Sequence, residues 1–305
     1  MGALNPGVAA AAPKSLTWRE TLGAYVALTK PRIISLLLIT TIPAMILAEQ
    51  GMPSAWLMFA TVLGGTLAAG GANAINCYID RDIDEVMHRT QRRPLPMGKV
   101  EPNHALIFAV ALEVAAFVLL VATSNLLAGV LALSATAFYV FVYTMWLKRR
   151  SRQNIVIGGA AGAVPPLVGW AAVTGDVTWA PIVLFAIVFF WTPPHFWALS
   201  IRYRDDYARA RVPMLPVVAT LDETKTQIFW YAVILVPVSL LLLATGTVGW
   251  IYGASALILG VGFVRETWAL RSNDTPGAAM GVFKWSIYYL ALLFVAVAAD
   301  QLILR

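Results

Sequence analysis

Apolar residues occur in long runs along this chain, and short polar segments separate the runs. Nine runs are long enough to cross a membrane as helices of about 20 residues, so the pattern predicts an all-α integral membrane protein. Their limits are 32–49, 55–76, 105–123, 126–147, 155–174, 180–201, 227–246, 249–268 and 282–303. Residues 1–15 are rich in Ala, Pro and Gly and are expected to form a flexible tail, with residues 16–305 as a single transmembrane domain.

The composition supports this interpretation. Hydrophobic residues make up 59% of the 305 positions and charged residues only 12%, whereas soluble domains carry about 25% charged residues. This balance excludes a soluble globule and a disordered chain. The single cysteine, Cys77, excludes a disulfide framework and a cysteine-based metal site.

The basic residues predict the orientation in the membrane. With nine spans, all Lys and Arg residues except Arg305 fall on one side of the bilayer. Loops rich in Lys and Arg stay in the cytoplasm, so the N-terminus and the two long loops, 80–104 and 202–226, are expected there, with the C-terminus on the outer side of the cell membrane (inner or plasma membrane). The net charge of +6 then reflects topology, and we do not expect nucleic acid as a partner.

The first long loop begins with polar residues at helical spacing. If the second run stays helical beyond the membrane, Asn76, Asp80 and Asp84 follow one another at about 6 Å along one helix face. Asn73 joins this face one turn earlier, and Asp82 points away from it. Carboxylate and amide oxygens are ligands that Mg²⁺ accepts, together with substrate phosphates.

A basic segment follows these acids directly. Guanidinium and ammonium groups bind phosphate oxygens, and the candidates here are Arg89, Arg92, Arg93 and Lys99. Metal-binding acids next to basic residues at the rim of an apolar domain predict a site for an amphiphilic diphosphate. The alternative is a solvated loop whose charges balance one another.

The sequence N-x-x-x-D-x-x-x-D at Asn76, Asp80 and Asp84, followed by Arg-Thr and Arg-Pro-Leu, resembles the first signature of the UbiA-type intramembrane prenyltransferases. The resemblance implies nine helices around a central cavity, and Mg²⁺ that binds a prenyl diphosphate. It also implies catalytic and metal-binding roles for these three residues. Arg89, Arg93 and Lys99 would then bind the diphosphate.

The second long loop departs from that family pattern. A second D-x-x-x-D is usual there, but Arg202 and Ala210 stand four residues before and after Asp206. We still expect Asp205 or Asp206 to assist catalysis, with Asp206 as a metal ligand and Arg209 on the diphosphate. In the alternative, one of these aspartates pairs with Arg202 or Arg209.

Residues 191–216 are the most specific part of the resemblance. The strings Pro-Pro-His-Phe-Trp-Ala-Leu, Tyr-Arg-Asp-Asp-Tyr and Val-Pro-Met-Leu-Pro are similar to those of the family branch that farnesylates heme. The implied reaction joins farnesyl diphosphate to a vinyl group of heme B, adds water and releases diphosphate, giving heme O. The implied partners are the lipid bilayer and a heme A synthase or terminal oxidase assembly factor.

Several residues are candidates for the heme or prenyl pocket. His195 lies near the inner end of the sixth run and is either a heme ligand or a histidine bonded to backbone across a break at Pro193-Pro194. Pro165-Pro166 should similarly break or bend the fifth run. The remaining pocket candidates are Trp197, Tyr139, Tyr143 and Asn73.

Three other functions remain open at this point. One keeps the fold and prenylates an aromatic acid, as in quinone biosynthesis. Another is a multi-pass transporter for an amphiphile, which midplane charges and broken helices would favour. A third is a heme-binding assembly factor without catalysis, which needs His195 but has no use for the Asp80 and Asp84 pair.

Overall fold

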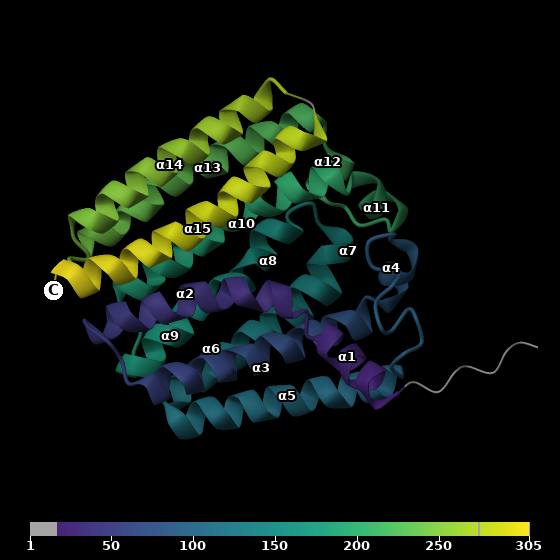
Figure 1. Ribbon diagram of the computed structural model, residues 1–305. Helices are drawn as coiled ribbons and strands as arrows, with labels where there is room; N and C mark the ends of the chain where they lie inside the picture. Colours follow the sequence, from purple (N-terminus) through teal and green to yellow (C-terminus); the bar gives the residue numbers. More distant parts are fainter. Residues whose placement is uncertain (1–16, 274, 305) are drawn as a thin grey trace, which may run out of the picture.

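The computed structural model describes residues 17–273 and 275–304, and every regular element in this part of the chain is a helix (Figure 1). The tail expected at residues 1–15 lies outside the described residues. Four short helices stand apart from the apolar runs: α1 (Trp18–Leu28), α4 (Arg81–Val86), α11 (Arg204–Arg209) and α12 (Leu215–Val218).

All nine predicted runs lie on helices. They correspond to α2 (Pro31–Glu49), α3 (Ala55–Ile79), α5 (Pro102–Thr123), α6 (Leu126–Ala137) with η1 (Phe138–Leu147) and α7 (Lys148–Arg150), α8 (Asn154–Ala163) with α9 (Pro165–Thr174), α10 (Trp179–Arg202), α13 (Leu221–Ala244), α14 (Trp250–Arg271) and α15 (Pro276–Leu304). Among the described residues, seven helices are long and apolar enough to cross a membrane. The two predicted runs missing from these seven are on α2 and α14. In α2 only the shorter apolar stretch Ile39–Glu49 is counted, and α14 carries the charged residues Arg265 and Glu266 within its apolar run. Nine spans therefore stays a prediction.

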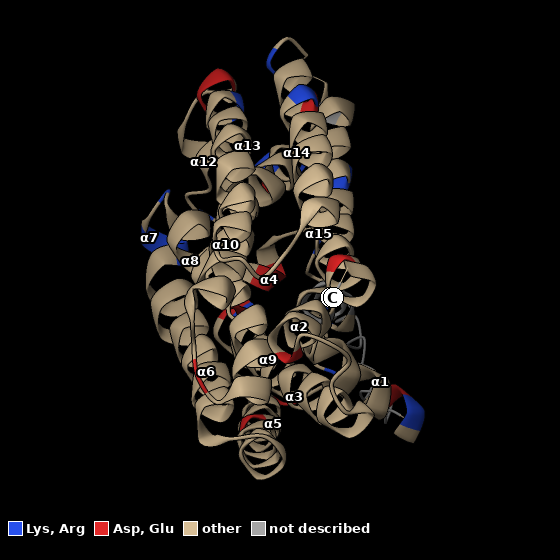
Figure 2. Ribbon diagram, turned by 90° about the vertical axis from the view of Figure 1, so that its left-hand side faces the viewer, with Lys and Arg blue, Asp and Glu red and all other residues tan. Residues whose placement is uncertain are grey.

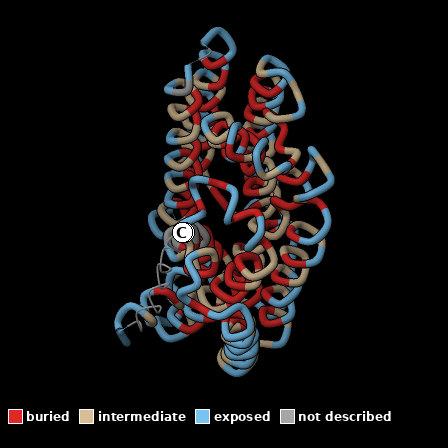
Figure 3. The backbone as a smooth tube through the Cα atoms, turned by 90° about the vertical axis from the view of Figure 1, so that its right-hand side faces the viewer, coloured by how far each residue is buried: buried red, intermediate tan, exposed pale blue. Residues whose placement is uncertain are grey.

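The helices pack side by side in a ring, in which contacts lead from α2 through α3, α5, α6, α8, α10, α13 and α14 to α15 and back to α2. Figures 1 and 3 show this bundle from the side and from one end. The antiparallel helices α13, α14 and α15 form one side, and α3, α5 and α6 form the other. The two sides are joined by α2, which packs on α3, α9 and α15, and by α10, which packs on α8, α13 and α15. The largest hydrophobic cluster fills the contacts among α10, α13, α14 and α15, with residues such as Trp191, Leu235, Phe263 and Phe294.

Small residues bring α3 unusually close to α5. A Cβ atom at Gly71 would lie 2.6 Å from Oε1 of Glu113 and 2.9 Å from the carbonyl oxygen of Ala109. Close helix approach at small residues is typical of packing within membranes. Glu113 is buried and accepts a hydrogen bond of 3.2 Å from Thr136 Oγ1 of α6. This contact fixes the position of α3, the helix that carries Asn73 and Asn76.

The two proline pairs have different effects. Pro165-Pro166 begins α9 after α8 has ended at Ala163, so the predicted break in the fifth run is confirmed. Pro193-Pro194 lies inside α10, which continues without interruption. The second pair removes backbone N–H donors, but α10 is held on several sides by α8, α13 and α15 and remains one helix.

The expected site loops gather at one end of the ring. In Figure 1, α1, α4, α11 and α12 lie at one end and the C-terminus lies at the other. Figure 2 shows little charge along most of the long helices, with Lys and Arg visible near α7 and at the start of α1. The two acidic loops therefore face each other across the same end of the helical ring.

At the opposite end, α15 caps the start of α14. Asp300 is fully buried, and its carboxylate accepts hydrogen bonds from the backbone N–H of Gly249 at 2.5 Å and of Tyr252 at 3.0 Å. The first N–H groups of a helix have no partner within the helix, so this carboxylate satisfies two of them.

We expect Asp300→Ala to destabilise the protein, because it leaves these two N–H groups without a partner at about 1–3 kcal/mol each. Thermal unfolding of the detergent-solubilised protein measures the effect, and the unfolding temperature should decrease by several degrees. Asp176→Ala is the matched control, since Asp176 is exposed in another loop. Equal unfolding temperatures for the two variants would contradict the capping role.

Candidate active site

The first acidic motif lies where α3 passes into α4. The helix is interrupted at Asp80, but the hydrogen bonds between successive turns continue through it. The N–H of Asp80 donates to the Asn76 carbonyl at 2.9 Å, and the N–H of Asp84 donates to the Asp80 carbonyl at 2.8 Å. The helical spacing predicted for Asn76, Asp80 and Asp84 is thus present.

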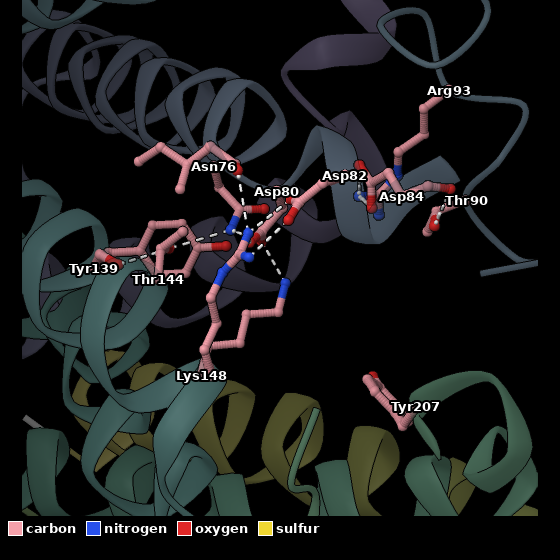
Figure 4. Close-up of polar contacts among 12 residues, drawn as sticks. Asn76, Asp80, Asp82, Asp84, Thr90, Arg93, Tyr139, Thr144, Lys148 and Tyr207 are labelled. Atoms are coloured by element: carbon pink, nitrogen blue, oxygen red, sulfur yellow. Dashed lines mark hydrogen bonds and ion pairs between the residues drawn. The ribbon is translucent and has the colours of Figure 1, made fainter. Parts of the chain in front are cut away.

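Asp80 is the centre of a buried polar cluster (Figure 4). Its carboxylate forms an ion pair with Nζ of Lys148, and Oδ2 also accepts a hydrogen bond of 2.7 Å from Asn76 Nδ2. The other oxygen, Oδ1, lies 3.5 Å from a guanidinium nitrogen of Arg149. This Oδ1 atom is buried and accepts no hydrogen bond from the described residues.

Asn76 links Asp80 to two further elements. Its Oδ1 accepts a hydrogen bond of 2.7 Å from Lys30 Nζ, and its Nδ2 donates to Thr144 Oγ1 at 3.1 Å. Lys30 stands at the corner between α1 and α2, with left-handed backbone at φ 53°. Burial lowers the pKa of Lys30 to about 8.

Asn73 does not reach this cluster through any hydrogen bond of the described residues. Its Nδ2 donates to the carbonyl oxygen of Thr29 at 3.1 Å. This bond holds the end of α1 against α3, directly before Lys30. Asn73 therefore positions the corner that presents Lys30 to Asn76.

Asp84 is bound by the loop that follows it. Nη1 of Arg93 donates to both carboxylate oxygens, at 2.9 and 2.8 Å, and Thr90 Oγ1 donates to the Asp84 carbonyl at 3.1 Å. Asp84 is 2% exposed. Burial disfavours the charged guanidinium of Arg93. The neighbouring Asp84 carboxylate favours it, and the pKa of Arg93 is raised above its usual value.

Asp82 is exposed on the other side of α4, as the spacing predicted. Both of its oxygens are 2.7 Å from guanidinium nitrogens of Arg149. The hydrogen bond to Arg149 lowers the pKa of the Asp82 carboxyl. Arg149 thereby joins the exposed Asp82 to the buried Asp80.

A π-helix directs the α7 cations to this cluster. In η1, Thr144 Oγ1 donates to the carbonyl of Tyr139 at 2.9 Å, and the helix continues directly into Lys148. The wider turn of a π-helix is often found at functional sites. Here it carries Thr144 to Asn76 and Lys148 to Asp80 on the neighbouring α3.

Tyr139 and Tyr143 lie on the same π-helix. Their rings stack with centroids 5.3 Å apart. Gly158 of α8 leaves room for Tyr143, because a Cβ atom there would be 2.3 Å from its Cδ2. Both tyrosines are partly buried, and Figure 4 shows Tyr139 beside Asn76 and Thr144 of the polar cluster.

The two aspartates of the second loop differ sharply. Asp205 is exposed, whereas Asp206 is buried and accepts hydrogen bonds from the backbone N–H of His88 at 3.3 Å and of Arg89 at 3.2 Å. Asp206 also pairs with Arg209, the alternative left open by the sequence. As placed, its carboxylate joins the second loop to the first.

The basic residues predicted to bind the diphosphate do not all lie close to Asp80 and Asp84. Arg89 lies over the rings of Tyr203 and Tyr207, 5.3 and 5.5 Å from their centroids, and donates to the Tyr207 hydroxyl at 3.2 Å. Lys99 is exposed and has no ion pair among the described residues. Of the predicted basic residues, Arg93 alone contacts Asp80 or Asp84 within the described chain.

His195 is buried on α10, and among the described residues its hydrogen bond goes to a side chain and not to a backbone carbonyl. Its Nδ1 lies 2.7 Å from Ser286 Oγ of α15, and its ring stacks on Trp191 at 4.2 Å and tilts against Phe283 at 4.6 Å. Trp197 is 2% exposed and packs edge-on against Tyr231. Trp197 is thus a core residue between α10 and α13 in this structure.

The donor set suits a hard cation such as Mg²⁺. Two buried carboxylates and an amide oxygen lie on successive turns, and Asp80 Oδ1 is left without a hydrogen bond. Cations occupy the other oxygens: Lys148 on Asp80 and Arg93 on Asp84. In the described part of the chain, no group of three or more His, Cys, Asp or Glu side chains lies close enough together to hold a metal ion.

Lys30, Thr144 and Lys148 are the site residues that the motif analysis missed. In the sequence, Lys30 and Lys148 count among the basic residues on one side of the membrane. Lys30 and Lys148 are far from Asp80 in the sequence and lie at other helices, so no local sequence pattern predicts that they meet. The contact depends on the ring of helices and on the π-helix.

Residues 37–298 match the UbiA prenyltransferase family. The chain belongs to this family. Its relatives include proteins named protoheme IX farnesyltransferase from Clavibacter michiganensis subsp. michiganensis, 55% identical over 93% of this chain and 96% of the relative. Another, from Gloeobacter violaceus, is 55% identical over 93% of both chains.

Solved structures agree on the fold. A digeranylgeranylglyceryl phosphate synthase structure matches with a TM-score of 0.76 at 19% identity, over 92% of this chain and 99% of that one. A UbiA homologue from Archaeoglobus fulgidus bound to GPP and Mg²⁺ matches with a TM-score of 0.63 at 15% identity, over 90% and 99%. The UbiA prenyltransferase fold predicted from the first acidic motif is thus confirmed.

We expect Asp206→Ala to loosen the first loop, because it removes the acceptor of two backbone N–H groups and the partner of Arg209. Limited trypsin digestion measures this, since Arg89, Arg92 and Arg93 lie in the released segment. Asp205→Ala is the matched control, as the neighbouring exposed aspartate. Cleavage at the same rate in both variants would show that Asp206 does not hold the loop.

Proposed function

We propose that this chain is a heme farnesyltransferase, which transfers the farnesyl group of farnesyl diphosphate to a vinyl group of heme B and adds water to give heme O and diphosphate. The observation that carries the proposal is the buried Asp80 and Asp84 pair, surrounded by cations at one end of the helical ring. The names of relatives 55% identical to this chain support heme as the acceptor. Aromatic-acid prenylation is the alternative that the product assay separates.

The diphosphate would bind at the polar cluster. Asn76, Asp80 and Asp84 are the proposed Mg²⁺ ligands, and bound Mg²⁺ would supply positive charge to the leaving diphosphate. Asp206 could become a further metal ligand only after its carboxylate releases its hydrogen bonds from the backbone N–H groups of His88 and Arg89. A structural neighbour from Archaeoglobus fulgidus was solved with GPP and Mg²⁺, which supports a metal-dependent diphosphate site in this fold.

The chain's own cations would assist bond cleavage. As the farnesyl carbon–oxygen bond breaks, negative charge develops on the diphosphate, and Arg93 and Lys148 lie next to the carboxylates that face it. Fixed positive groups at that point stabilise the transition state. Arg89, Lys99 and Arg209 are proposed as further diphosphate contacts after the loops rearrange, with Asp205 or Asp206 assisting.

The allylic carbocation then needs a dry, electron-rich surrounding. The stacked Tyr139 and Tyr143 lie beside the cluster and can stabilise a cation through their ring faces. Attack by the vinyl group forms the new carbon–carbon bond and moves the positive charge to the porphyrin side. Addition of water there and loss of its proton complete heme O, and diphosphate leaves.

His195 is the proposed contact for heme. Its Nδ1 is engaged by Ser286, and such a bond fixes the ring and leaves Nε2 for iron. Trp197, Asn73 and the two tyrosines would shape the pocket, Trp197 and Asn73 through the packing described above.

We further propose that the protein lies in the cell membrane with its N-terminus and acidic loops in the cytoplasm and its C-terminus outside. The lipid bilayer surrounds it, and farnesyl diphosphate would reach the cytoplasmic end. The product would pass to a heme A synthase or a terminal oxidase assembly partner. The placement of both acidic loops opposite the C-terminus supports this orientation.

The product assay combines purified protein with heme B, farnesyl diphosphate and Mg²⁺, and measures the mass of extracted pigment. We expect a gain of one farnesyl group plus one water. Asp80→Asn should reduce the rate roughly a hundredfold or more, because a buried charged group at the diphosphate is lost.

Glu85→Gln is the control, since Glu85 is an exposed carboxylate on the same short helix α4 and forms no ion pair among the described residues. Unchanged heme together with prenylated 4-hydroxybenzoate would refute the heme acceptor. Equal rates for Asp80→Asn and the wild type would show that Asp80 does not take part in catalysis.

Binding of hemin tests His195 separately. We expect the wild type to give the Soret band of a histidine-ligated heme, and His195→Gln to lose that band while still binding farnesyl diphosphate. His104→Gln is the matched control, because His104 is exposed in the first turn of α5. Identical spectra for all three proteins would restrict His195 to its contact with Ser286.

A further inference from the structure

The polar cluster contains more positive than negative side chains. Three carboxylates, Asp80, Asp82 and Asp84, are paired with Lys148, Arg149 and Arg93. A fourth cation, Lys30, donates to Asn76 in the same cluster. The residues proposed to hold a divalent cation are therefore already neutralised by cations of the chain itself.

We infer that Lys148 and Arg93 act as internal counter-ions that occupy the carboxylates before catalysis, so that Mg²⁺ binds well only together with the diphosphate. This inference rests on the proposed function. Lys148 would leave Asp80 for the diphosphate oxygens as the metal takes its place, and Arg93 would do the same at Asp84. Both are positioning residues until that exchange and diphosphate contacts after it.

Electrostatics gives the direction of this coupling. A divalent cation that enters alone meets an excess of positive charge at short range, where Coulomb energies in a partly buried site are large. The diphosphate group carries more negative charge than one metal ion carries positive charge. Metal and diphosphate together therefore match the cluster, whereas the metal alone does not.

The geometry supports an exchange and not a permanent ion pair. Asp80 is fully buried, but Lys148 keeps 14% of its side chain exposed, and Arg93 keeps 27%. Both cations stand on segments at the end of the ring, α7 and the loop after α4, so their long side chains can turn without moving a spanning helix. Asp80 Oδ1 accepts no hydrogen bond from the described residues, and the Arg149 guanidinium lies 3.5 Å from it, so a metal ion could bind this oxygen without breaking a hydrogen bond.

Equilibrium dialysis of the detergent-solubilised protein against Mn²⁺ tests the inference without any prenyl transfer. We expect Lys148→Met to bind Mn²⁺ alone roughly tenfold more tightly than the wild type, because one competing charge is gone. The same variant should bind farnesyl diphosphate, with Mn²⁺ present, roughly tenfold more weakly. Arg150→Met is the matched control, since Arg150 is exposed and has no ion pair among the described residues.

Opposite changes in the two affinities distinguish an exchanging counter-ion from a structural residue, whose loss would weaken both. Mn²⁺ affinity of Lys148→Met equal to or below that of the wild type would overturn the inference. Should that variant fail to fold, Arg93→Met tests the same exchange at Asp84. Wild-type protein must also retain more Mn²⁺ with farnesyl diphosphate than without it.

These outcomes are separable from the proposed function. If the two affinities change as expected while heme B stays unmodified in the product assay, the acceptor is wrong and the counter-ion exchange stands. If wild-type protein binds no farnesyl diphosphate at all, the proposed function fails first.

Discussion

The buried ion pair between Asp80 and Lys148 is the interaction on which the site depends. Removing a carboxylate and an ammonium group from water costs several kcal/mol for each ion, so neither is tolerated in a helical bundle unless both are paired. The pairing here extends through Asn76 to Lys30 and through Arg149 to Asp82. Losing one partner would leave a buried charge uncompensated, so the cluster works as a unit.

The fold supplies each member of this cluster from a different element. Gly71 allows α3 to approach α5, which fixes the helix bearing Asn76. The π-helix sends Lys148 toward α3, and the bond from Asn73 to Thr29 holds the corner at Lys30. At the cytoplasmic end proposed here, Asp206 fastens the second loop onto the first. The spanning helices therefore serve to bring polar groups from distant parts of the sequence to one point.

Local patterns predicted the parts of this structure that depend on neighbours in sequence. Long apolar runs predicted the helices, and the motif predicted the helical spacing of Asn76, Asp80 and Asp84 that the structure has. The contacts of Lys30 and Lys148 were not predictable, because each joins residues on separate helices and has no spacing rule. Trp197, a candidate for the pocket, is 2% exposed and packs against Tyr231, and its place at the pocket stays a prediction. Pro193-Pro194 did not end α10, because packing on three sides outweighed the lost N–H donors.

The central claim is that the Asp80 and Asp84 cluster binds the metal and the diphosphate together. Anomalous diffraction from crystals grown with Mn²⁺ and a non-hydrolysable farnesyl diphosphate analogue locates the metal directly. The account predicts a peak about 2.1 Å from a carboxylate oxygen of Asp80 or Asp84, with Nζ of Lys148 moved from Asp80 to a diphosphate oxygen. A metal bound only at Asp205 or Asp206, with the Lys148–Asp80 pair intact, would contradict it.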